Sequence, residues 1–167
     1  MQTSELSAAE LAEIERKYDP ETAFRSTGPQ LAFAVSFLLV AMSVYHFYAA
    51  GFALIPELMH RGIHISFVLS LVFILFGWRK APATDMAPPA WWRFQGVPYL
   101  DLLWSLLAVA AAMYLPLLPP EIVAQRVGNP SQLDIFMGTA LLLLTLEAAR
   151  RSIGPTLPII GIVFILF

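Results

Sequence analysis

Between Leu31 and Ala50 the chain runs for about 20 residues without an aspartate, glutamate, lysine or arginine. At a rise of about 1.5 Å per residue, a helix of that length crosses a hydrocarbon layer of about 30 Å. Four further apolar runs follow, from His60 or Ile63 to Trp78, from Val97 to Leu118, from Ser131 to Ala149, and from Ile153 to Phe167. The pattern predicts an all-α integral membrane protein with four transmembrane helices and the start of a fifth.

The composition excludes an ordinary soluble domain. Of the 167 residues, 58% are hydrophobic and 13% are charged, whereas soluble domains carry about 25% charged residues. The net charge of −2 gives no reason to expect nucleic acid as a partner. Because the chain has no cysteine, disulfides, thiolate metal sites and cysteine nucleophiles are also excluded.

The first 28 residues form the one strongly polar stretch of the sequence. Early glutamates rule out a signal peptide. Ser7 and Glu10 are spaced as a capping box, which predicts a short amphipathic helix that ends near Lys17, before the break at Asp19-Pro20. We therefore expect three parts: a cytoplasmic N-terminal segment (1–28), a four-helix membrane module (29–150), and the start of a linking fifth helix (151–167). Since the last run stops without polar anchors, we expect the chain to be a fragment.

The basic residues predict the orientation of the chain. Eight of the ten lysines and arginines lie before the first run, between the second and third, or after the fourth, namely Arg16, Lys17, Arg25, Arg79, Lys80, Arg93, Arg150 and Arg151. The other two connections hold only Arg61 and Arg126. The positive-inside rule then places the N-terminus in the cytoplasm. Trp91, Trp92 and Arg93 are expected to anchor an interfacial segment at the cytoplasmic boundary, because tryptophan rings and guanidinium groups suit that depth.

Three acidic residues lie inside or at the ends of the expected membrane helices. Asp101 and Asp134 come one turn inside the third and fourth helices, and Glu147 lies at the cytoplasmic end of the fourth. Because a carboxylate within a span is costly, it usually has a cationic partner. We expect Asp101 and Glu147 to pair with nearby basic residues of the cytoplasmic side, and Asp134 to pair with Arg61 or Arg126. The nearby cytoplasmic-side residues are Arg79, Lys80, Arg93, Arg150 and Arg151. A proton- or cation-coupling role is the alternative, although none of the three lies near the expected midplane.

The histidines are the other candidates for chemistry. His60 and His64 are four residues apart, and His46 lies at a similar depth on the preceding helix. Two imidazoles on facing helices can bind a haem iron or another metal. The simpler interpretation is that all three are boundary histidines bonded to backbone or headgroups, because no further ligand or supporting carboxylate pattern is evident.

Sequence templates for catalysis are absent. The chain has no glycine-rich phosphate loop, no Gly-x-Ser-x-Gly and no His-Glu-x-x-His. We therefore expect no enzyme activity and no cofactor in this chain. Small residues within the runs, among them Ser66, Ser70, Ser105 and Gly138, indicate surfaces where helices approach closely.

Several short motifs together suggest a family. They are the sequence from Arg16 to Glu21, Tyr48-Ala49-Ala50-Gly51-Phe52, Arg61-Gly62-Ile63-His64, Pro98-Tyr99-Leu100-Asp101, Asp134 with Gly138, and the stretch from Glu147 to Gly154. From about Arg16 to its end, the chain resembles the N-terminal part of the fused permeases of tripartite ATP-independent periplasmic (TRAP) transporters, in particular the TAXI type. In that family a four-helix small module runs into a twelve-helix large module.

The resemblance implies a scaffold role in the bacterial inner membrane. The expected partners are membrane lipids, a large transport module fused at the C-terminal side and a periplasmic binding protein that delivers the solute. Substrate and sodium sites would lie in the large module, so this chain would need no cofactor. The family-like structural positions are Arg61, His64, Asp101, Asp134, Glu147, Arg150 and Arg151.

Two other functions remain open from the sequence. One is a membrane redox subunit that binds b-type haem through His46 and His64. The other is a small dimeric proton-coupled transporter with Asp101 as the coupling acid.

Overall fold

The computed structural model describes residues 24, 25, 27–78 and 90–167. Within this part the chain is mostly helical, with α2 (Pro29–Gly51), α3 (Glu57–Leu75), α4 (Tyr99–Tyr114), α5 (Pro120–Arg126), α6 (Gln132–Ser152) and α7 (Thr156–Leu166). Helices α2, α3 and α6 are each long and apolar enough to cross a membrane, whereas α4 and α7 are shorter apolar helices. The helix expected to begin at Ser7, and the basic residues Arg79 and Lys80, lie outside the described residues.

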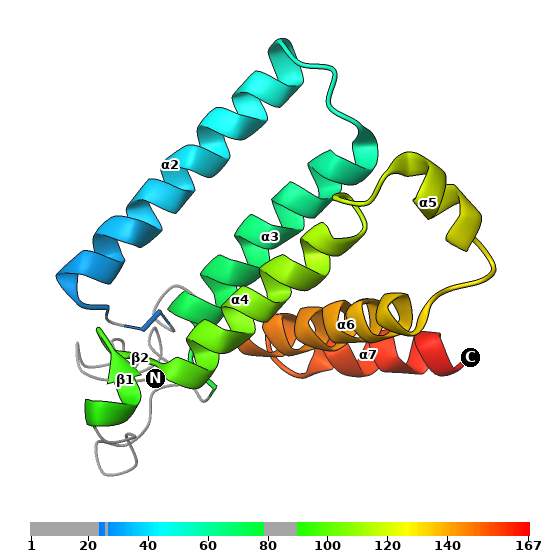
Figure 1. Ribbon diagram of the computed structural model, residues 1–167. Helices are drawn as coiled ribbons and strands as arrows, with labels where there is room; N and C mark the ends of the chain where they lie inside the picture. The colour runs from blue at the N-terminus through cyan, green and yellow to red at the C-terminus, as the bar shows by residue number, and fades with distance from the viewer. Residues whose placement is uncertain (1–23, 26, 79–89) are drawn as a thin grey trace, which may run out of the picture.

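Helices α3 and α4 lie side by side at the centre of the molecule (Figure 1). Helix α6 packs across both of them, and α7 turns back along α6. Helix α2 packs on α3 through one stripe, which begins with Leu31 and Val35 and continues through Leu38 and Met42. The last turns of α3 and α6 and the first turns of α2 and α4 therefore meet at one end of the molecule.

Two apolar clusters hold the helices together. The first lies between α2, α3 and the start of α4, and consists of Leu31, Val35, Leu71, Ile74 and Val97. The second lies between α3, α4 and α6, and consists of Leu69, Phe73, Ala108, Leu144 and Ala148. Phe73 and Val97 are fully buried, so one large side chain closes the centre of each cluster.

Small residues allow α3 and α4 to approach closely, as the sequence predicts. Gly62 is buried on α3, and a Cβ atom placed on it would lie 2.5 Å from Cγ of Pro116 and 3.0 Å from the carbonyl oxygen of Ala112. Further along the same interface Ser70 and Ser105 are buried. Gly138 differs, because it is exposed and a Cβ there would meet open space.

The second apolar run folds over different bounds from those expected. Helix α3 begins at Glu57, before the expected start at His60 or Ile63. Proline is well tolerated just before the first helical residue, and Pro56 occupies the N-cap. The helix ends at Leu75 rather than Trp78 because Phe76 is extended and forms an isolated antiparallel bridge with Phe24.

The third apolar run, expected from Val97 to Leu118, is helical only over α4. Its first two residues belong to a hairpin of β1 (Arg93–Phe94) and β2 (Val97–Pro98), which follows the 3-10 turn Ala90–Trp92. The hairpin turn is Gln95-Gly96, with φ values of 52° and 90°, as in the two-residue turns that favour glycine. At the other end α4 stops before Pro116, which has no amide hydrogen to continue the helix.

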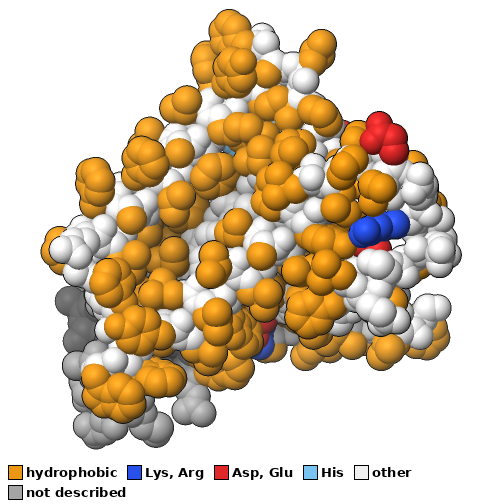
Figure 2. Space-filling view, viewed as in Figure 1, with side chains coloured by type: hydrophobic (Ala, Val, Ile, Leu, Met, Phe, Trp, Pro, Cys, Tyr) orange, Lys and Arg blue, Asp and Glu red, His pale blue; other side chains and the backbone are white. Residues whose placement is uncertain are grey.

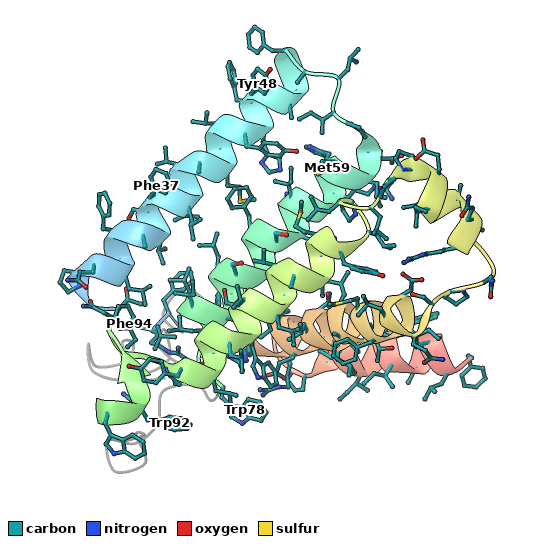
Figure 3. All side chains as sticks on the ribbon, in the orientation of Figure 1. Phe37, Tyr48, Met59, Trp78, Trp92 and Phe94 are labelled. Atoms are coloured by element: carbon teal, nitrogen blue, oxygen red, sulfur yellow. The ribbon has the colours of Figure 1, made fainter. Side chains whose placement is uncertain are left out.

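The outer faces of the helices are strongly apolar (Figure 2). On α2 the side chains of Phe33, Phe37 and Phe47 are 74%, 64% and 72% exposed. Phe37 points away from the other helices in Figure 3. Such extensive apolar exposure exceeds what a monomeric soluble protein shows, and is the surface expected of helices that face lipid or a protein partner.

Candidate functional site

Charged side chains gather where the ends of α3 and α6 meet the start of α4. We call Arg25, Asp101, Glu147, Arg150 and Arg151 the ion-pair network. Its central residue is Arg151 on α6, whose side chain is only 1% exposed. Nη1 of Arg151 donates to Oδ1 of Asp101 over 2.9 Å, and Nε donates to Oε1 of Glu147 over 2.7 Å. Each acid thus neutralises a different part of one buried guanidinium.

Asp101 joins two segments to α4. Its Oδ2 atom accepts from Nη2 of Arg25 over 2.6 Å, while its Oδ1 atom accepts from Arg151. Asp101 also lies in the first turn of α4, where a negative charge interacts favourably with the helix dipole. With both oxygens bound to guanidinium groups and only 5% of the side chain exposed, this carboxylate is arranged as a structural link.

Glu147 and Arg150 complete the network on the last turns of α6. Arg150 donates from Nε and Nη2 to the two oxygens of Glu147, both over 2.7 Å. Nη2 of Arg150 also donates to the carbonyl oxygen of Trp78 over 3.3 Å, and Nη1 of Arg151 donates to that of Phe76 over 3.3 Å. The carbonyl groups after the end of α3 are therefore bound by α6.

Aromatic rings surround the buried guanidinium. The Cζ atom of Arg151 lies 5.0 Å from the ring centroid of Phe73 and 5.5 Å from those of Trp78 and Trp104. Trp78 also lies 4.9 Å from Cζ of Arg150. Cation–π attraction strengthens when the cation is removed from water. The rings therefore stabilise the Arg151 guanidinium through cation–π contacts, in addition to its hydrogen bonds with Asp101 and Glu147.

The partners predicted for Asp101 and Glu147 are correct in part. The sequence predicts that Asp101 and Glu147 pair with nearby basic residues, and Arg150 and Arg151 do so. Arg93 was also expected near these acids, but it lies on the hairpin strand β1, and the ion pairs of the described residues do not include it. Sequence reasoning missed Arg25 as a partner of Asp101, because the two are 76 positions apart.

A second set of polar contacts lies at the opposite end of α4. Asp134 caps α6 together with Ser131: the Ser131 side chain accepts from the Asp134 amide, and Asp134 accepts from the Ser131 amide. Oδ1 of Asp134 also accepts from Nη1 of Arg126 over 2.8 Å and from the Tyr114 hydroxyl over 2.7 Å. The predicted pairing of Asp134 with Arg126 is confirmed. Arg61 instead pairs with Glu57 on the exposed surface of α3.

These contacts attach the short helix α5 to its neighbours. The hydrogen bond to Asp134 raises the pKa of the Arg126 guanidinium above its ordinary value. Helix α5 has no fully buried residue. Its position therefore depends on Arg126, which reaches Tyr114 of α4 and Asp134 of α6.

We predict that Asp134→Ala loosens α5 and the first turn of α6. The substitution removes the acceptor for Arg126, Tyr114 and the Ser131 amide, so hydrogen–deuterium exchange followed by mass spectrometry will be faster in both segments. Tyr114→Phe removes one of these hydrogen bonds and is expected to have a smaller effect. Unchanged exchange in α5 after Asp134→Ala contradicts the role given to Arg126.

The interfacial tryptophans lie near the ion-pair network end. Trp91 is 74% exposed and Trp92 is 46% exposed, and their rings are 5.4 Å apart. Trp78, Trp92 and Phe94 lie at the same end of the molecule in Figure 3. This is the end that contains Arg25, Arg150 and Arg151.

The histidines meet at the other end, as their predicted depth suggested. Nε2 of His46 lies 2.8 Å from Nδ1 of His64. A tetrahedral zinc ion, or a haem iron held between two axial imidazoles, has bonds of about 2.0–2.1 Å and keeps its two nitrogens roughly 3.3 Å or more apart, so the rings would have to separate to hold either ion. Among the described residues, no three metal-ligating side chains are placed so that they could hold one metal ion. The predicted bonding to backbone holds for His46, since Nδ1 contacts the Met42 carbonyl oxygen over 2.7 Å.

The fold and the ion pairs together define a mostly helical chain with three candidate membrane spans, in which Asp101 of α4 binds Arg151 of α6 and Arg25, which precedes α2. No protein-family model, curated protein or solved structure matches the chain.

Proposed function

We propose that the chain is a membrane scaffold module of a TRAP-type secondary transporter in the bacterial inner membrane. In this role it supports sodium-coupled uptake of a solute that a periplasmic binding protein delivers. It crosses the membrane four times, through α2, α3, α4 and α6, with its N-terminus in the cytoplasm, and α7 begins the link to a large transport module. The proposal continues the family resemblance drawn from the sequence motifs.

The observation that carries the proposal is that the carboxylates of the helix bundle are occupied by structural contacts. A carboxylate that couples transport to an ion has to bind and release that ion. Both oxygens of Asp101 are held by arginines, and Glu147 is held by Arg150 and Arg151. Asp134 is engaged in a helix cap and by Arg126. Such groups suit a static framework better than a transport path.

The distribution of basic residues supports the orientation. Arg25, Arg150 and Arg151 lie at the network end. Arg61 lies in the first turns of α3, and Arg126 on α5, both at the opposite end. The positive-inside rule then assigns the network end to the cytoplasm, where the exposed Trp91 and Trp92 suit the headgroup boundary.

The size and partners of the native product test this function. An antibody against residues near Ser4–Tyr18, applied to the source membrane, is expected to detect a band several-fold larger than 18.5 kDa, and mass spectrometry of that band is expected to identify a large transport module. A band at 18.5 kDa without a co-purifying transport module contradicts the proposal.

Charge reversal tests the scaffold role more directly. We predict that Arg151→Glu or Arg150→Glu impairs membrane insertion or assembly with the transport module before it changes solute affinity. Arg151→Glu places a third carboxylate beside Asp101 and Glu147 in a buried site. Arg61→Glu is the matched control, since Arg61 is 70% exposed. Normal assembly with altered affinity would overturn the prediction.

A further inference from the structure

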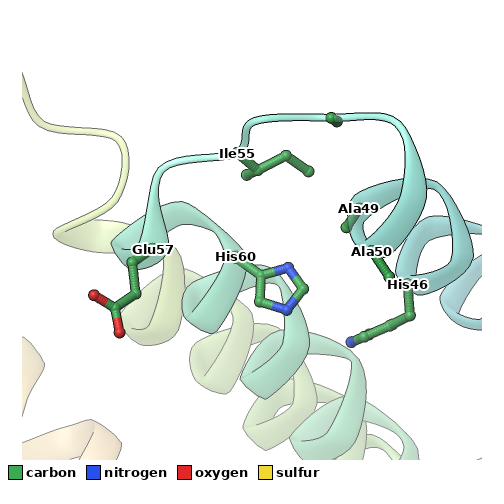
Figure 4. A pocket seen from close by; sticks show the side chains of 7 residues that line it. His46, Ala49, Ala50, Ile55, Glu57 and His60 are labelled. Atoms are coloured by element: carbon green, nitrogen blue, oxygen red, sulfur yellow. The ribbon is translucent and has the colours of Figure 1, made fainter.

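The second half of α2 contacts α3 through a group of aromatic and imidazole side chains. We call Tyr45, His46, His60 and His64 the histidine cluster. His46 and His64 are in direct contact through their ring nitrogens, and the Tyr45 hydroxyl lies 3.1 Å from Nδ1 of His60. His46 and His60 both line a cavity of about 460 Å³, and their rings lie close together (Figure 4). Their centroids are 5.4 Å apart.

The hydrogen bonds of His46 limit how many protons the contact can hold. A carbonyl oxygen only accepts, so Nδ1 of His46 must carry the hydrogen that it gives to Met42. When His46 is neutral, its Nε2 accepts a hydrogen from Nδ1 of His64. When His46 is charged, its Nε2 donates and His64 must be neutral. The hydrogen bond between His46 and His64 can therefore persist when one proton is added to the pair. It is lost when both imidazoles are protonated, because two N–H groups then face each other.

The other charged groups around the cluster leave this limit in place. Glu57 lines the same cavity, and its carboxylate is paired with Arg61 of the next turn. From α4, the titratable side chain at this end is Tyr114, which is bound to Arg126 and Asp134. His64 is exposed on the surface of α3, and His46 lines the cavity.

We propose that the histidine cluster is a pH-sensitive contact that holds the C-terminal half of α2 on α3 and releases it on acidification. Histidine changes its charge between about pH 8 and 5. With two added protons, His46 and His64 become adjacent cations, which repel each other at contact distance. The first half of α2 stays in place, because Leu31 and Val35 are held in an apolar cluster. This inference does not depend on the proposed function.

Distances between spin labels on the full chain test the inference. The chain has no cysteine, so labels can be placed at Ala50→Cys on α2 and Gln125→Cys on α5, both of which are exposed. Pulsed electron paramagnetic resonance is expected to give a longer distance at about pH 5 than at about pH 8. Labels at Phe33→Cys and Gln125→Cys report on the first half of α2, and their distance is expected to remain constant.

Two variants identify the responsible pair. His64→Gln keeps a group that can hydrogen-bond to His46 but cannot become a cation, so the A50C–Q125C distance is expected to stay short at both pH values. His60→Gln leaves the His46–His64 contact intact and is expected to keep the lengthening. A constant distance in the chain that retains all three histidines, or lengthening that persists in His64→Gln, would overturn the inference.

Discussion

Asp101→Ala is expected to lower the free energy of unfolding by about 3–5 kcal/mol, the typical cost of removing one partner from a buried ion pair. Arg151 then loses a hydrogen-bonded counterion while its side chain remains only 1% exposed. The cost arises from the charge left in the interior more than from the lost attraction. Thermal or denaturant unfolding in one detergent, followed by circular dichroism, measures the effect.

The same substitution also weakens contacts beyond α4. Asp101 accepts from Arg25, which precedes α2, and from Arg151, near the end of α6. Faster amide exchange is therefore expected at the end of α6 and at residues 24 and 25, in addition to the global loss of stability. If faster exchange is confined to the first turn of α4, then Asp101 acts only through its interaction with the dipole of that helix.

Glu57→Ala is the matched control for charge removal. Glu57 and Arg61 form an ion pair on α3 with side chains 76% and 70% exposed. Exposed pairs contribute about 0–1 kcal/mol, so this variant is expected to unfold close to the parent chain. If Asp101→Ala is no more destabilising than Glu57→Ala, the network does not hold the helix ends together.

A double variant separates the charge of Arg151 from its packing. In Asp101→Ala/Arg151→Met the buried cation that Asp101 had helped to neutralise is gone, and an unbranched apolar side chain takes its place among Phe73, Trp78 and Trp104. Replacing a buried ion pair by apolar groups is often nearly neutral. We therefore expect the double variant to be more stable than Asp101→Ala alone.

Much of the fold could be predicted from the apolar runs. Each run contains a helix, because a stretch of apolar residues with few charges has to satisfy its backbone internally. The bounds were less accurate, since they depend on single residues: Pro116 shortens α4, and the bridge between Phe24 and Phe76 ends α3. Helix α5 was missed, although a proline at its first position is a recognised start signal.

Some of the polar contacts could also be predicted from the sequence, and others could not. Glu147 and Arg151 are four residues apart on α6, so helix periodicity predicts that they meet. The contact of Arg25 with Asp101 depends on how distant segments pack, which no local pattern in the sequence records. The aromatic rings around Arg151 come from α3, α4 and the segment after α3, and they were missed for the same reason.

The second large effect is expected from Gly62→Ala, which adds one methyl group where α3 and α4 touch. That methyl carbon would lie 2.5 Å from Cγ of Pro116, 3.0 Å from the Ala112 carbonyl oxygen and 3.4 Å from Sδ of Met113. The proline ring and the backbone oxygen cannot move aside as a flexible side chain can, so the two helices have to separate. Overpacking of this kind costs about 1–3 kcal/mol, and a lower midpoint of thermal unfolding in detergent measures it.

Gly138→Ala gives the opposite expectation from the same chemical change. Gly138 also lies inside a helix, but a Cβ there meets nothing within 4 Å. Alanine in a helix interior is favoured over glycine by about 0.5–1 kcal/mol, because glycine loses more backbone entropy on folding. We therefore expect Gly138→Ala to raise the unfolding midpoint and Gly62→Ala to lower it. If both raise it, helix propensity outweighs the contact at Gly62, and the small residues are not what brings α3 and α4 together.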